Sequence, residues 1–206
     1  MYWPIPILVP LLALASLPAE AGPWPREKGR LFGTLSKDGA QYSSLYLDVG
    51  VTARTSLTLE AGKDDAQGKA LLFLRHALPL KGKTAAALEI GAGLEGAHPV
   101  LSAGFSIGRG VSFGKRSGWI TAETRGFFDI SGGIERATLS LTLGQHHSSR
   151  VLSIAQINSE ASAAGISATL ATTAVWEFKP GFHMELGAEV GTSAAPKAKL
   201  GIWFRF

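Results

Sequence analysis

The last nine residues of the chain, Ala198-Lys-Leu-Gly-Ile-Trp-Phe-Arg-Phe206, decide the fold. From Ala198 onward every second residue is apolar, and the positions between hold Lys, Gly, Trp and Arg. A period of two is typical of a β-strand with one apolar face and one mixed face. A strand at the end of a chain frays unless it is paired, so we expect this strand to lie in a sheet.

This segment resembles the terminal strand of Gram-negative outer-membrane β-barrels. In that class the last residue is typically Phe, with apolar or aromatic residues at alternate positions before it, and the barrel-insertion machinery recognises it. The resemblance implies that Ile202, Phe204 and Phe206 form the insertion signal. It also implies a location in the cell outer membrane, among lipid that includes lipopolysaccharide. A half-buried strand of a soluble periplasmic sandwich or barrel is the alternative.

Residues 1–21 are predicted to be a secretory signal peptide. A short apolar run ends at Ala19-Glu-Ala21, a small-x-small cleavage site before Gly22. No Lys or Arg precedes the run, so a retained N-terminal anchor stays an alternative. The chain has no cysteine, which excludes a disulfide and a lipid anchor on cysteine. Residues 22–29 then form a polar lead with two prolines, without regular structure.

Residues 30–206 are predicted to form one transmembrane domain. Alternating segments of roughly ten residues, separated by turn residues, are the signature of a membrane barrel. Residues 86–95 show it best, because Leu88 and Ile90 share one face and Glu89 and Gly91 the other. After the signal, no apolar run approaches the roughly 18 residues of a membrane helix, and only helices and closed barrels span a membrane.

The expected fold is therefore all-β, a closed antiparallel barrel of about twelve strands, or about ten or eight if ambiguous neighbours merge. Most loops are expected to be short. Residues 110–117 are predicted to be a basic connection and residues 159–163 a loop. Residues 69–78 are nearly all apolar, so their facing stays open.

Composition favours a membrane barrel over a soluble one. Only 17% of residues are charged, which is low for a solvent-exposed shell, and the polar strand face is rich in Gly and Ser. The formal net charge of +4 is scattered along the chain, so no nucleic-acid partner is expected. No sequence motif indicates a cofactor or a metal site.

The inward face carries a set of charged residues that we expect to line the lumen. They are Glu60, Glu89, Glu123, Arg125, Arg136, Glu185, Glu189, Lys199 and Arg205. Such groups set the selectivity of a narrow channel, or pair with one another to fill a closed structural barrel. Inward glycines, among them Gly91, Gly108 and Gly201, remove side-chain volume and favour open space.

A weak catalytic candidate is the set His146, Ser148 and Glu160. It is similar to the site of outer-membrane lipid A 3-O-deacylases, which implies Ser148 as nucleophile, His146 as base and Glu160 as the group that orients it. In that family the pair lies near the C-terminus and an Asn follows the Ser, whereas here Ser149 follows and the chain continues to Phe206. A polar turn with an ordinary loop Glu is the alternative.

Gly104-Phe-Ser-Ile-Gly108 matches the Gly-x-Ser-x-Gly nucleophile elbow, but that elbow needs a turn from a strand into a helix. These residues follow a strand alternation, so we expect a plain strand. The sequence thus leaves three hypotheses: a narrow pore or structural barrel, a lipid-modifying enzyme, and a barrel that docks a protein partner. The first is the leading one.

Overall fold

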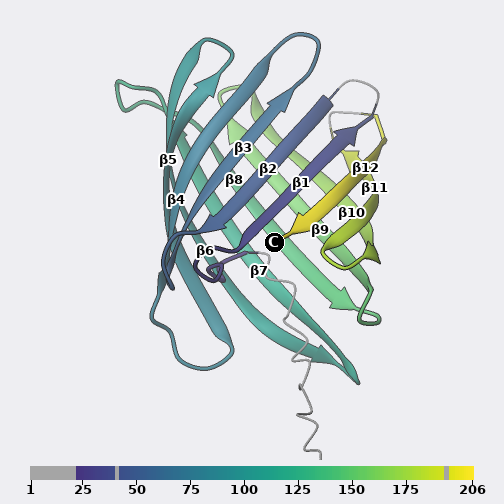
Figure 1. Ribbon diagram of the computed structural model, residues 1–206. Helices are drawn as coiled ribbons and strands as arrows, with labels where there is room; N and C mark the ends of the chain where they lie inside the picture. Colours follow the sequence, from purple (N-terminus) through teal and green to yellow (C-terminus); the bar gives the residue numbers. More distant parts are fainter. Residues whose placement is uncertain (1–21, 40–41, 193–194) are drawn as a thin grey trace, which may run out of the picture.

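The computed structural model describes residues 22–39, 42–192 and 195–206, which form a closed barrel of antiparallel strands (Figure 1). Each strand pairs with its neighbours in the chain, and β1 pairs with β12 to close the barrel. Within the described ranges, no helix is long and apolar enough to cross a membrane. The strands are β1 Leu31–Asp38, β2 Tyr42–Gly50, β3 Thr55–Lys63, β4 Gly68–Leu78, β5 Thr84–Glu95, β6 His98–Phe113, β7 Arg116–Phe128, β8 Ile134–His146, β9 Val151–Ser162, β10 Gly165–Lys179, β11 Phe182–Gly191 and β12 Lys197–Arg205. The predicted fold class is confirmed.

The end of the chain is held by the closing strand pair. β1 and β12 are in register from Phe32 opposite Arg205 to Asp38 opposite Lys199. The backbone of Phe206 continues this ladder, because its N–H donates to Leu31 and its carbonyl accepts from Leu31, at 2.9 and 2.8 Å. The last residue is therefore paired, as the terminal pattern requires (Figure 1).

The outer face of the barrel is apolar. Large side chains that point outward are 40–63% exposed, among them Leu72, Leu74, Leu88, Ile90, Leu101, Leu139, Leu141, Leu143, Leu186 and Leu200. An exposed apolar surface of this extent is unsuited to water and matches the hydrocarbon belt of a transmembrane barrel.

Aromatic rings gather on the outside at the rim where β12 ends, which we call the terminal rim. Phe182 lies 6.5 Å from Phe178 and 5.6 Å from Phe206 between ring centroids. Trp176 on the same strand as Phe178 is 53% exposed. Amphipathic and aromatic side chains of this kind form the interfacial girdle of membrane barrels.

Two predicted loops are strand instead. Residues 110–117 belong to the hairpin of β6 and β7, which stays paired up to Phe113 opposite Arg116. Residues 159–162 belong to β9, which stays paired up to Ser162 opposite Gly165. Polar and glycine residues suggested loops there, but cross-strand hydrogen bonds satisfy the backbone up to turns of two residues.

The sequence left open which side chains of residues 69–78 face inward. The burial pattern of β4 settles this. Leu71, Phe73 and Arg75 point into the lumen and are nearly inaccessible, whereas Leu72 and Leu74 face outward. The segment gave no alternation because apolar side chains occupy both of its faces.

Candidate functional site: the barrel lumen

A buried ion pair joins β4 and β5 inside the barrel. Arg75 and Glu89 are directly opposite each other in the strand register. The Nε and Nη2 atoms of Arg75 donate to Oε2 of Glu89 at 3.1 and 2.9 Å, and each side chain is 7% exposed. Burial of both charges requires this pairing, because an unpaired buried charge costs several kcal/mol.

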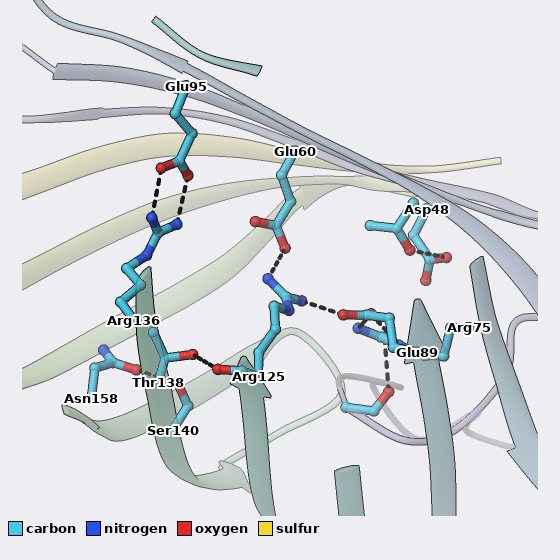
Figure 2. Close-up of polar contacts among 12 residues, drawn as sticks. Asp48, Glu60, Arg75, Glu89, Glu95, Arg125, Arg136, Thr138, Ser140 and Asn158 are labelled. Atoms are coloured by element: carbon cyan, nitrogen blue, oxygen red, sulfur yellow. Dashed lines mark hydrogen bonds and ion pairs between the residues drawn. The ribbon is translucent and has the colours of Figure 1, made fainter. Parts of the chain in front are cut away.

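Arg125 on β7 extends this pair into a bridge across the lumen (Figure 2). Its Nη2 atom lies 2.7 Å from Oε1 of Glu89 on β5, and its Nη1 atom donates to Oε1 of Glu60 on β3 at 3.1 Å. The guanidinium carbon stands 4.2 Å from the centroid of the Phe73 ring. One side chain thus links three strands that are not adjacent to its own.

The residues that the structure describes enclose a smaller and a larger cavity inside the barrel. A cavity of about 210 Å³ surrounds the bridge and is lined by Glu60, Arg75, Glu89, Glu123 and Arg125, among others. A second cavity of about 430 Å³ has a mixed lining that includes Asp38, Tyr42, Asn158, Glu189, Lys197 and Lys199. Gln156 borders both cavities, so the two spaces adjoin.

Arg136 makes a second set of ion pairs on the other side of Arg125 (Figure 2). Its Nη1 and Nη2 atoms donate to the two carboxylate oxygens of Glu95, each at 2.6 Å, in a bidentate fork. Its Nε atom lies 3.5 Å from Glu160, and its guanidinium carbon lies 3.7 Å from the Phe127 ring centroid.

The remaining predicted lining residues lie on β11 and β12. Glu185 is buried and binds Lys199 Nζ at 3.0 Å and the indole N–H of Trp203 at 2.8 Å. Glu189 lines the larger cavity. Arg205 lies at the terminal rim, where its Nη2 atom is 3.0 Å from His183 and 3.8 Å from Glu177.

Sequence reasoning missed several lumen groups. Arg75 was missed because β4 shows no alternation, and Asp48 and Glu95 were left out of the predicted lining although they lie on the polar faces of alternating segments. It also missed that part of the lumen is apolar. Leu71, Phe73, Val100 and Phe127 form one buried cluster, and Trp119, Leu152 and Val175 form another, against which Trp24, Ile154 and Trp203 pack.

Gly91, Gly108 and Gly201 do not mark open space, contrary to expectation. A Cβ built at Gly91 would lie 2.2 Å from the Phe73 ring, and one at Gly201 would lie 2.7 Å from Glu185 Oε2. A Cβ at Gly108 would lie 2.7 Å from Trp24. These three glycines make room for neighbouring side chains that already occupy those places in the lumen.

The lead at residues 22–29 lies against the inside of the barrel. Pro23 is fully buried, and the carbonyl of Gly22 accepts a hydrogen bond from Arg75 Nη1 at 3.1 Å. Arg26 Nε is 2.8 Å from the buried carboxylate of Asp48. Lys28 forms a parallel β-bridge with Gly50. Residues 22–29 form no helix and belong to none of the twelve strands, and nothing in the sequence indicated that this lead enters the lumen.

The structure does not bring the three residues of the catalytic candidate together, because Glu160 lies far along β9 from His146. Ser148 lies in the turn between β8 and β9, where its Oγ atom accepts from the backbone N–H groups of Arg150 and Val151. Glu160 is eight residues beyond Leu152, the partner of His146, or roughly 26 Å at about 3.3 Å per residue. Glu160 pairs with Arg136 instead. The Gly-x-Ser-x-Gly match lies within β6, as expected.

No group of His, Cys, Asp and Glu within the described part of the chain is placed to hold a metal ion. The chemistry of the lumen is therefore that of paired carboxylates and guanidiniums beside polar cavities. Charged groups of this kind at a constriction can set which ions or polar solutes pass.

No protein-family model and no curated protein matches the sequence. The fold matches solved outer-membrane barrels over most of their length. The KdgM porin aligns with a TM-score of 0.71 at 6% identity, covering 86% of this chain and 99% of that one. The NanC porin aligns with a TM-score of 0.64 at 9% identity, covering 84% of this chain and 98% of that one. Omp33 of Acinetobacter baumannii aligns with a TM-score of 0.51 at 8% identity, covering 87% of this chain and 98% of that one. The chain therefore has the fold of outer-membrane porins.

Proposed function

We propose that this protein is a narrow passive channel of the outer membrane for small polar solutes. The bridge that Arg125 makes across the lumen, next to the two adjoining cavities, carries the proposal. Fixed charges at a constriction decide which solutes pass. The apolar outer belt and the likeness to outer-membrane porins support the location.

The orientation follows from the position of the terminal rim. Both the start of β1 and the end of β12 lie there, and we place this rim on the periplasmic side. The outward-facing Ile202 and Phe206, 46% and 57% exposed, are then accessible to the insertion machinery together with Phe204. On this orientation the larger cavity opens toward the cell exterior, near lipopolysaccharide.

Planar-bilayer recording of the refolded mature chain tests the proposal. Heat-modifiable gel mobility first establishes that the barrel is closed. We expect discrete openings of small conductance, and Arg125→Ala to change their size, with Arg150→Ala in the exposed β8–β9 turn as the matched control. A folded barrel that stays silent at all voltages would leave a purely structural barrel as the function.

A further inference from the structure

Residues 22–28, which we call the N-terminal plug, occupy the inside of the barrel next to the smaller cavity. Gly22 contacts the ion-pair network through the hydrogen bond from Arg75. Trp24 packs against the apolar cluster of Trp119, Leu152 and Val175, whose members are at most 6% exposed. The plug thus touches Arg75, one of the residues that line the cavity around Arg125.

The charges around this cavity do not balance without the plug. Its lining holds three carboxylates, Glu60, Glu89 and Glu123, but only the two guanidiniums of Arg75 and Arg125. Glu60 and Glu89 are paired, whereas Glu123 makes no ion pair with any residue in the described ranges. One carboxylate in a partly buried site is left over, and a cation beside it would offset the cost of burying an unpaired charge.

Gly22 is placed beside this carboxylate. A Cβ built on Gly22 would lie 3.3 Å from Oε1 of Glu123 and 2.6 Å from Cγ2 of Thr121. Glycine is therefore the residue that fits here, and its main chain lies close to the unpaired carboxylate. Gly22 is also the residue that the expected cleavage after Ala21 would make the first of the mature chain.

We propose that the α-ammonium group of the processed Gly22 binds Glu123 and locks the N-terminal plug in the channel. The ammonium group would be the third positive charge beside Arg75 and Arg125. It would balance Glu123, the third carboxylate of the cavity lining. The proposal rests on the channel function for its conductance test and on cleavage after Ala21 for the ammonium group. Processing of the precursor would then complete the lumen, since an amide at residue 22 carries no charge.

The barrel wall is shaped for the plug at two further glycines. A Cβ at Gly50 would lie 2.1 Å from the carbonyl oxygen of Glu27, and one at Gly108 would lie 2.7 Å from Trp24 and 2.9 Å from Pro23. A side chain at either position would displace the plug. Gly110, two residues along β6, has no atom within 4 Å of its Cβ position and provides a matched control.

Amine labelling of the mature protein tests the ammonium site directly. An amine-reactive reagent at neutral pH modifies an exposed α-amine selectively, because that amine ordinarily has a pKa of about 7.7–8.0. We expect Gly22 in the folded barrel to react at least about tenfold more slowly than in urea, since a paired ammonium stays protonated. Glu123→Gln should restore most of the reactivity, and Glu189→Gln, in the other cavity, should not. Equal labelling in folded and unfolded wild type would overturn the proposal.

Conductance measurements on two variants test whether the plug narrows the channel. Deletion of residues 22–25 keeps the Arg26–Asp48 pair, and Gly108→Val should expel Trp24 while the chain stays complete. Both should conduct severalfold more than wild type, and Gly110→Val should not. Openings of wild-type size in both variants would contradict the claim that residues 22–28 obstruct the channel. If both variants fold but stay silent while Gly22 of the wild-type barrel is still protected, the channel function fails and the ammonium site stands.

Discussion

The guanidinium carbon of Arg125 stands 4.2 Å from the ring centroid of Phe73, and this ring is completely buried inside the barrel. The contact joins the apolar cluster of the lumen to the charged bridge. An arginine that stacks on an aromatic face gains a favourable cation–π interaction, so Phe73 both fills space and holds the bridge in place.

Phe73→Ala should therefore destabilise the barrel by about 3–5 kcal/mol, because it leaves a cavity in a packed interior. Leu72→Ala on the adjacent, lipid-facing position should cost less than half as much. Urea unfolding of both variants in detergent, followed by tryptophan fluorescence, measures the two values. A larger loss of unfolding free energy for Leu72→Ala than for Phe73→Ala would contradict the assignment of Phe73 to the lumen and Leu72 to the lipid.

Glu89 is expected to be the most sensitive of the lumen carboxylates. It binds both Arg75 and Arg125, so Glu89→Gln leaves buried guanidiniums poorly compensated and should cost about 3–5 kcal/mol. Glu27→Gln breaks an ion pair whose partners are each 65% exposed, and its cost should stay below about 1 kcal/mol. The urea midpoints of the two variants provide the comparison, and equal midpoints would contradict the buried network.

The stability of the β7–β8 turn should fall in acid. Hydrogen bonds from the Ser131 hydroxyl and from the Gly133 backbone lower the pKa of the Asp129 carboxyl below its ordinary value of 3.8. A lowered carboxyl pKa stabilises the folded turn above pH 3.8, and this contribution is lost as the pH falls through the lowered value.

Carboxyl NMR titration of the folded barrel checks this. Asp129 should titrate below 3.8, and Ser131→Ala should move its pKa upward, because the principal donor is removed. An unchanged titration in Ser131→Ala would show that the hydroxyl does not hold this carboxylate.

The number of strands and most of their facing were predictable, because lipid and lumen impose different chemistry on alternate residues. Leu88 and Glu89 illustrate this, since one faces lipid and the other the network. The fourth strand was not predictable in its facing, because Phe73 is apolar yet points inward against Arg125. Loop lengths were overestimated where polar residues continue a ladder.

The partners within the lumen could not be predicted from the sequence. Arg125 and Glu60 are 65 residues apart, and only the register of the closed barrel brings them together. The lead likewise has no periodicity, so its place inside the barrel depends on Gly108, Gly50 and Asp48, which are distant in the chain. The separation of Glu160 from Ser148 is a consequence of the same register.

The most direct test of the channel is its ion selectivity, measured as the reversal potential in a KCl gradient. Arg125→Ala removes a positive charge from the lumen and should shift the channel toward cations, whereas Glu60→Gln removes the opposing negative charge and should shift it toward anions. Shifts of opposite sign from these two partners of one ion pair are the predicted result. Openings whose selectivity is unaffected by both substitutions, or the absence of any current from folded barrels, would contradict the account.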